Sequence, residues 1–127
     1  YAADYGFADS LHITGWVDNP MSYVELFDVA CLLSRWEGFG LALPEYMMAG
    51  KPIVASRVDA IPNIIRDGEN GLLVEVDDDI GASKAVLRIY QEDGLRDRLV
   101  AQGIEDVHNR FNARRVSEEH GKLFERL

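Results

Sequence analysis

Two glutamates, Glu37 and Glu45, flank a Gly-rich turn in the otherwise apolar segment SRWEGFGLALPEYMMAGKPIVAS, with seven residues between them. Carboxylates accept hydrogen bonds from paired hydroxyl groups, which sugars and ribose supply. Gly38 and Gly40 let the backbone approach a ligand closely or adopt a positive φ. The amides of Gly40 and Leu41 would lie at the start of a helix, where an anion is favoured. The pattern therefore favours a ligand that carries both phosphate and hydroxyl groups, such as a nucleotide sugar.

The same features also have a purely structural explanation. A glutamate in the first turn of a helix is favoured by the helix dipole whether or not a ligand binds. A Gly-rich turn between a strand and a helix is common in α/β proteins. Taken alone, these residues leave a ligand site and an ordinary connecting turn equally open, and the elements around them have to be considered.

Short apolar runs alternate with segments of helical periodicity along most of the chain. This alternation predicts an α/β fold, a partial Rossmann-like parallel sheet followed by carboxy-terminal helices. Ligands of such sheets bind at the carboxyl ends of the strands. The loop that holds Glu37 follows the second of the expected strands. Those four strands are Leu11–Thr14, Val29–Leu33, Ile53–Ala55 and Leu72–Val74.

The helical segments are expected between and after these strands, at residues 21–28, 43–49 and 61–66. Apolar residues at helical spacing then continue from Ala82 to Tyr90 and from Leu95 to Phe111. A weaker stripe formed by Val116, Leu123 and Leu127 predicts a last surface helix.

The composition limits the classes of function. The chain has 127 residues, of which 47% are hydrophobic and 28% charged, as expected for one globular domain covering residues 1–127. A formal net charge of -9 argues against binding to nucleic acid or to an anionic membrane, both of which need a basic surface. No apolar run approaches the ~18 residues of a membrane span. We expect a cytoplasmic protein, at most peripheral to the cytoplasmic face of a membrane.

The start of the sequence suggests that the domain is truncated on its amino-terminal side. It begins with Tyr1 rather than Met, and YAADYGF resembles the last turns of a helix that ends at Gly6. The single cysteine, Cys31, excludes an internal disulfide and is expected to be a small buried residue of a strand.

The sequence shows no pattern that predicts a metal site or a cofactor. The three histidines are dispersed, without the spacing of metal ligands. The acidic run Asp77-Asp78-Asp79 follows an expected strand and precedes an expected helix, so we expect it to cap that helix within a solvated turn. The histidines are His12, His108 and His120.

At the Gly-rich turn the sequence resembles a known family. Glu37–Leu41, then Glu45, then Met48–Ser56 are similar to the E-x7-E signature of retaining glycosyltransferases of the GT-B fold, in particular the large family 4 (glycosyl transferases group 1). The resemblance covers nearly the whole chain. Further matching segments are His12–Val17, Val29–Ser34 and Ile65–Val74.

The resemblance implies a carboxy-terminal domain that binds the donor, a nucleotide-diphosphate sugar. Glu45 would hold the ribose hydroxyls, and Glu37 would be the catalytic-site residue that contacts the hydroxyls of the donor sugar. Transfer with retention would then depend on positioning and on stabilising the leaving diphosphate, without a protein nucleophile. Donor and phosphate contacts would come from Gly38, Phe39, Gly40 and Leu41.

The sequence departs from the family in ways that matter for activity. The Arg and Lys that usually neutralise the diphosphate have no counterpart upstream of Glu37. Arg35, the only Lys or Arg before Glu37, lies in the Glu37 loop itself and not in the earlier loop where the family carries them. The amino-terminal domain that the resemblance leads one to expect for the acceptor has no counterpart within these 127 residues. We therefore expect the isolated chain to be inactive and to bind nucleotides weakly. A smaller departure is Val58–Asn63, where the family more often has a Gly pair and a Glu, so that Asn63 should not be interpreted as a functional carboxylate.

Two other classes of function stay open. One is a non-catalytic α/β interaction module on the same scaffold, which would tolerate loss of Glu37 and Glu45. The other is a GT-B sugar enzyme with a different reaction, a phosphorylase or an epimerase, although no lysine matches a phosphate or cofactor site of a phosphorylase. For the transferase, the expected partners are a nucleotide-diphosphate sugar, the amino-terminal domain of the same protein, and an acceptor that is a glycan, a lipid or a small molecule.

Overall fold

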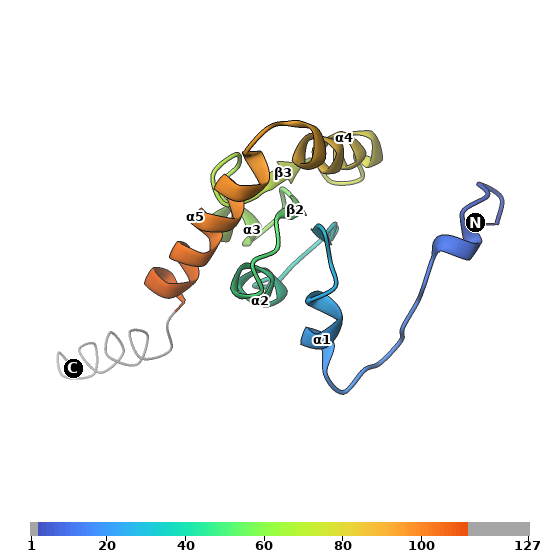
Figure 1. The fold of residues 1–127 in the computed structure, drawn as a ribbon, viewed down its shortest axis with the longest axis horizontal. Helices are drawn as coiled ribbons and strands as arrows, with labels where there is room; N and C mark the ends of the chain where they lie inside the picture. The colour runs from blue at the N-terminus through green and yellow to red at the C-terminus, as the bar shows by residue number, and fades with distance from the viewer. Residues whose placement is uncertain (1–2, 112–127) are drawn as a thin grey trace.

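The computed structural model describes residues 3–111 and contains a three-stranded parallel sheet with helices on both faces (Figure 1). The strands are β1 (Ala30–Leu32), β2 (Ile53–Ser56) and β3 (Leu72–Val74), in the order β1-β2-β3. The predicted α/β class with a parallel sheet is confirmed.

The helices occupy the segments between the strands and the carboxy-terminal part of the described chain. Helix α2 connects β1 to β2, and α3 connects β2 to β3, as crossover connections in a parallel sheet require. Two longer helices, α4 and α5, follow β3. The bounds are η1 (Ala8–Ser10, a 3-10 helix), α1 (Pro20–Val24), α2 (Ala42–Met48), α3 (Ile61–Ile64), α4 (Asp79–Gln91) and α5 (Leu95–Arg110).

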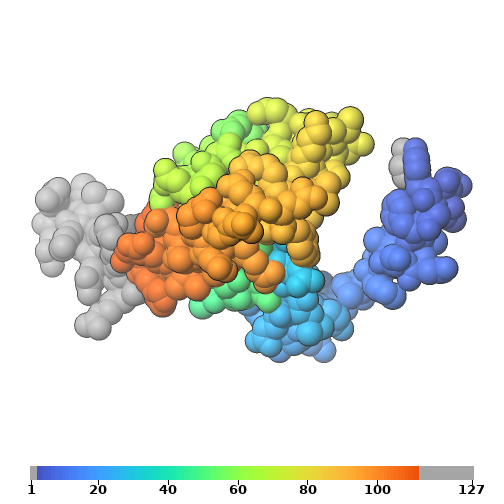
Figure 2. Space-filling view, turned by 45° about the horizontal axis from the view of Figure 1, so that its top comes forward, coloured from blue at the N-terminus to red at the C-terminus, as the bar shows by residue number. Residues whose placement is uncertain are grey.

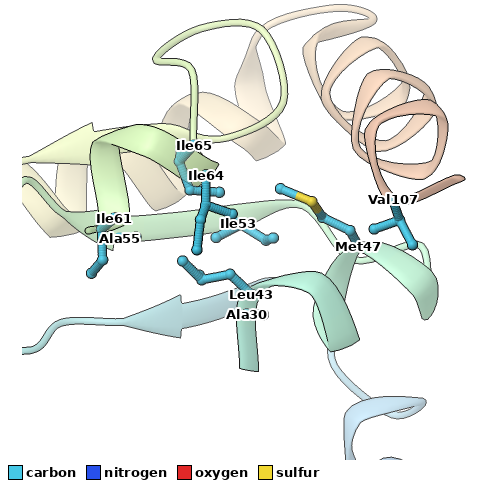
Figure 3. Packing of buried hydrophobic residues seen from close by; sticks show 9 residues of the cluster. All are labelled: Ala30, Leu43, Met47, Ile53, Ala55, Ile61, Ile64, Ile65 and Val107. Atoms are coloured by element: carbon cyan, nitrogen blue, oxygen red, sulfur yellow. The ribbon is translucent and has the colours of Figure 1, made fainter. Parts of the chain in front are cut away.

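The central strand β2 organises the core because all four of its residues are buried. Successive side chains of a strand point to opposite faces of the sheet. Accordingly, Ile53 and Ala55 pack into one apolar cluster, while Val54 packs into the other. The first cluster lies between the sheet, α2, α3 and the end of α5, and Figure 3 shows its side chains. The second is covered by α4 and the start of α5. Because β2 is packed on both faces, the loops before and after it start from fixed positions.

The predicted strand Leu11–Thr14 is wrong, so the described sheet has three strands rather than four. Residues 3–19 run away from the sheet in Figure 1 and stand apart from the rest of the molecule in Figure 2. Ile13 is 85% exposed and Trp16 is 95% exposed. A strand exists only by pairing with a neighbour, and an apolar run without a paired edge beside it stays an extended arm.

Cys31 is also placed differently from the expectation. It lies in β1, at the edge of the described sheet, and is exposed, not buried. Partial burial nevertheless raises the pKa of its thiol. The stripe of Val116, Leu123 and Leu127, and His120, lie outside the described residues. Within residues 3–111, the helices are too short or too polar to span a bilayer.

Candidate functional site

The loop that holds Glu37 lies at the carboxyl end of β1, as predicted from the sequence. The strand ends at Leu32 and α2 begins at Ala42, with Pro44 in its first turn, where a missing N–H costs no helical hydrogen bond. Gly40 adopts a φ of 72°, and a Cβ added there would lie 3.2 Å from the Leu43 Cδ1 atom. The backbone conformation therefore favours glycine at this position, and a larger residue would also need the Leu43 side chain to shift by a few tenths of an ångström.

The side chain of Glu37 folds back onto its own loop. One carboxylate oxygen accepts a hydrogen bond from the Gly40 amide at 3.2 Å, and the other accepts one from the Ser34 hydroxyl at 3.4 Å. Both distances are long compared with the usual values of about 2.9 Å and 2.7 Å for such bonds. The Gly40 amide, predicted as a ligand contact, is thus occupied by Glu37, but through a weak bond that a ligand can replace.

Glu45 lies in the first turn of α2 and is exposed. Its carboxylate has no ion-pair partner among residues 3–111. Beside it, burial first and the Glu45 charge second raise the pKa of Tyr46. Phe39 and Leu41 are 51% and 70% exposed, and Gly38 faces open space. Of the predicted residues, Gly38, Phe39, Leu41 and Glu45 are therefore exposed, Glu37 is half-buried, and Gly40 is buried beneath the Glu37 side chain.

A hollow of ≈ 510 Å³ lies at the carboxyl ends of the strands and adjoins this loop. Its lining includes Arg35 from the loop and Ser56 at the end of β2, but neither Glu37 nor Glu45. The structure therefore places both glutamates outside the lining of this hollow. The complete lining is Leu33, Arg35, Ser56, Val74, Glu75, Asp77, Asp78 and Asp79.

The charges in this hollow are mostly negative. Arg35 donates from Nε to the Asp77 carboxylate at 2.8 Å, and this bond and charge raise the pKa of the guanidinium. Asp78 accepts a hydrogen bond from the Gly81 amide at 2.8 Å and caps α4, which confirms the predicted capping role of the acidic run. Within residues 3–111, no three His, Cys, Asp or Glu residues converge closely enough to hold a metal ion.

One contact of this loop was not predicted. The backbone N–H of Glu37 donates to the Asp59 carboxylate at 2.8 Å, from the loop that follows β2. The two residues are 22 positions apart in the sequence. The sequence signal for this contact is indirect: Asp59 stands in the stretch where the resemblance leads one to expect a Gly pair. The structure agrees with that signal, because Asp59 has a positive φ of 46°.

Comparison with known proteins identifies the family. The model of the family described as "Glycosyl transferases group 1" matches residues 1–106. The chain belongs to this family. The match includes the Glu37 loop, α2, the whole sheet and most of α5.

Curated group 1 relatives are found in several bacteria. A lipopolysaccharide core biosynthesis glycosyltransferase, LpsE of Rhizobium meliloti, is 30% identical over 122 residues, which are 96% of this chain and 36% of that protein. A phosphatidyl-myo-inositol mannosyltransferase of Mycolicibacterium smegmatis is 40% identical over 121 residues, 93% of this chain and 31% of that protein. The chain thus spans about a third of the length of these relatives.

Solved structures share the fold of this group 1 chain. Sucrose-phosphate synthase of Thermosynechococcus elongatus superposes with a TM-score of 0.89 at 28% identity, covering 98% of this chain and 32% of that one. HepE of Anabaena, in complex with UDP and glucose, superposes with a TM-score of 0.92 at 16% identity, covering 99% of this chain and 35% of that one. At the lower identity the likeness concerns the fold alone. Together they place the three-stranded sheet within the GT-B architecture.

Proposed function

We propose that this chain is the donor-binding part of a retaining glycosyltransferase that moves a hexose-type sugar from a nucleotide-diphosphate sugar to a glycan, lipid or small-molecule acceptor. The observation that carries the proposal is the exposed loop of Glu37 at the carboxyl end of β1, in a chain whose residues 1–106 match a glycosyltransferase family. Strand ends of a parallel sheet are where ligands of α/β proteins bind.

In this proposal the two glutamates do different work. Glu45, exposed in the first turn of α2, accepts hydrogen bonds from the ribose hydroxyls. Glu37 exchanges its two long internal hydrogen bonds for hydroxyls of the donor sugar, which frees the Gly40 amide for the ligand. The backbone between Gly38 and Leu41 then contacts the sugar and phosphate. No metal is assigned a role, and the retaining outcome follows from positioning the acceptor on the face that the diphosphate leaves.

In this proposal, the rest of the whole protein binds the acceptor and forms the surface that faces the Glu37 loop. Transfer needs donor and acceptor held together with water excluded. In the part described, the site is an open edge of the sheet, with Phe39 and Leu41 exposed beside the loop. This supports a second domain of the whole protein closing over the site. The proposal also places the protein in the cytoplasm.

The test is a kinetic comparison of Glu37→Gln and Glu45→Gln in the whole protein, with release of nucleoside diphosphate from a panel of UDP-, GDP- and ADP-sugars. Each lost charge-assisted bond to ribose is worth ~1.5–3 kcal/mol in both ground and transition states, so Glu45→Gln should raise KM more than it lowers kcat. Glu37 acts beside the carbon where charge develops, so its substitution should lower kcat roughly 10–1000-fold.

Glu105→Gln, an exposed change on α5, is the matched control and should leave both constants unchanged. The same kinetic signature for the two site variants would overturn the division of labour. Wild-type kcat/KM in both would overturn the site. A wild-type protein without turnover or binding of any nucleotide sugar would support the interaction module instead, and phosphorolysis or epimerisation of a sugar would support the other GT-B reactions.

A further inference from the structure

Two non-glycine residues of the described chain have a positive φ, and both contact the same loop. Asp59, with a φ of 46°, lies between β2 and α3, and Asp77, with a φ of 62°, lies between β3 and α4. The Asp59 carboxylate accepts from the Glu37 amide at 2.8 Å, and the Asp77 carboxylate accepts from Arg35 at 2.8 Å. Each left-handed aspartate thus reaches from the end of another strand, β2 or β3, to the loop after β1.

The left-handed conformation determines which side chains can stand at these positions. An L residue adopts it at a steric cost, which glycine avoids and which aspartate and asparagine tolerate better than other residues. A glycine would remove this cost at position 59 but would offer no acceptor to the Glu37 amide. The residue present therefore retains strain together with a hydrogen bond that only a polar side chain can make.

The two contacts hold different parts of the loop. The Arg35–Asp77 ion pair joins two side chains that are 67% and 62% exposed, so it is screened by salt. The Asp59 contact is also exposed, but it joins a carboxylate to a backbone amide and so constrains the peptide of Glu37 itself. The Glu37 side chain has only its 3.2 Å and 3.4 Å bonds, so the 2.8 Å bond to its backbone is the shortest one that orients this residue.

We propose that Asp59 is a positioning residue for Glu37, holding the Glu37 peptide so that its carboxylate can leave the loop and meet the donor sugar without the loop rearranging. The proposal rests on the proposed function, because it gives Glu37 the donor contact. Asp59 acts through the backbone of Glu37 and does not itself contact the substrate. Its loss therefore acts on the step in which Glu37 takes part, and leaves the ribose contact of Glu45 in place.

The first measurement concerns the contact alone and needs no donor. Hydrogen exchange of the Glu37 amide is followed by NMR in the 127-residue chain. Asp59→Gly keeps the backbone conformation and removes the acceptor, and should speed exchange at least fivefold. Asp59→Asn keeps an oxygen acceptor and should stay within twofold of wild type. Asp93→Gly, a matched control in the exposed connection between α4 and α5, should leave the Glu37 amide unchanged.

The second measurement is the kinetics of the whole protein with the nucleotide sugar that it turns over. Asp59→Gly should lower kcat at least fivefold with a donor KM within twofold of wild type, which is the signature expected of Glu37 variants, and Asp59→Asn should restore kcat. Unchanged exchange of the Glu37 amide, or wild-type kcat in Asp59→Gly, would overturn the proposal. A wild-type protein without turnover would overturn the proposed function, and the role of Asp59 with it, while the exchange result would still show whether the contact exists.

Discussion

Replacement of Asp106 by Ala is expected to destabilise the chain more than any nearby surface change. This residue of α5 is 5% exposed, and its carboxylate accepts hydrogen bonds from Asn70, Arg66 and Gln102. Asn70 is itself 1% exposed, donates also to the Ile64 carbonyl, and accepts from the Arg66 amide at 2.7 Å. The group therefore joins the turn before β3 to the last helix of the described chain.

The magnitude follows from what each partner loses. A hydrogen bond to a charged group is worth ~1.5–3 kcal/mol, and the buried NH2 group of Asn70 would keep only its bond to the Ile64 carbonyl. The Arg66 side chain is 38% exposed and can turn to water, so the cost stays below the ~3–5 kcal/mol of a fully buried broken pair. We expect a loss of about 2–3 kcal/mol in the free energy of unfolding, or roughly 7–11 °C in Tm for a domain of this size.

Urea unfolding of the 127-residue chain, followed by circular dichroism, measures this loss directly. Glu105→Ala changes the neighbouring exposed residue of the same helix and should cost less than about 0.5 kcal/mol. Asp106→Asn keeps the shape of the side chain but places an NH2 donor near other donors. Its loss in the free energy of unfolding should fall between those of Asp106→Ala and Glu105→Ala. Equal stability of the Asp106 and Glu105 variants would refute the reasoning, since it would mean that the buried carboxylate contributes nothing beyond an exposed one.

Two further changes test the loop and the edge strand. Gly40→Ala combines a φ of 72° with a contact of 3.2 Å to Leu43, so it should destabilise the chain by about 1–2 kcal/mol in urea unfolding, and a neutral effect would contradict the observed backbone. Burial raises the pKa of the Cys31 thiol, so at pH 8 iodoacetamide should alkylate the folded chain more slowly than the chain in urea. Because the thiol of the folded chain loses its proton at a higher pH than that of the unfolded chain, its contribution to stability is present below the unfolded pKa and is lost as pH rises through the folded pKa. Equal alkylation rates in the folded and the urea-unfolded chain would refute the raised pKa and this pH dependence.

Local sequence patterns were sufficient where each element carried its own signal. The apolar runs at Val29–Leu33, Ile53–Ala55 and Leu72–Val74 correspond to β1, β2 and β3 within one or two residues at each end. The Gly-rich turn and Pro44 likewise placed the start of α2. The Asp78 cap was predictable because a cap depends only on residues within one helical turn.

The errors concern features that depend on a partner far away in the sequence. Leu11–Thr14 has the composition of a strand, but no edge pairs with it in the described part of the chain. Cys31 looks buried by its neighbours in sequence, yet its exposure depends on which helices cover β1. The contacts of Asn70 with Asp106, and of Glu37 with Asp59, join residues 36 and 22 positions apart, and no local periodicity encodes them.

The charge distribution at the strand ends determines how an anionic donor could be held there. The hollow contains one basic residue, Arg35, against four carboxylates, and Arg35 is already paired with Asp77. A diphosphate entering it would meet repulsion from Glu75, Asp78 and Asp79 before any net attraction. Its favourable contacts in this chain are therefore the amides of the Glu37 loop, which contribute on the order of 0.3–2 kcal/mol per charge. Tight binding of a diphosphate in this hollow then requires positive charge beyond the paired Arg35, and the acidic hollow favours the uncharged, hydroxyl-rich part of a nucleotide sugar over its phosphates.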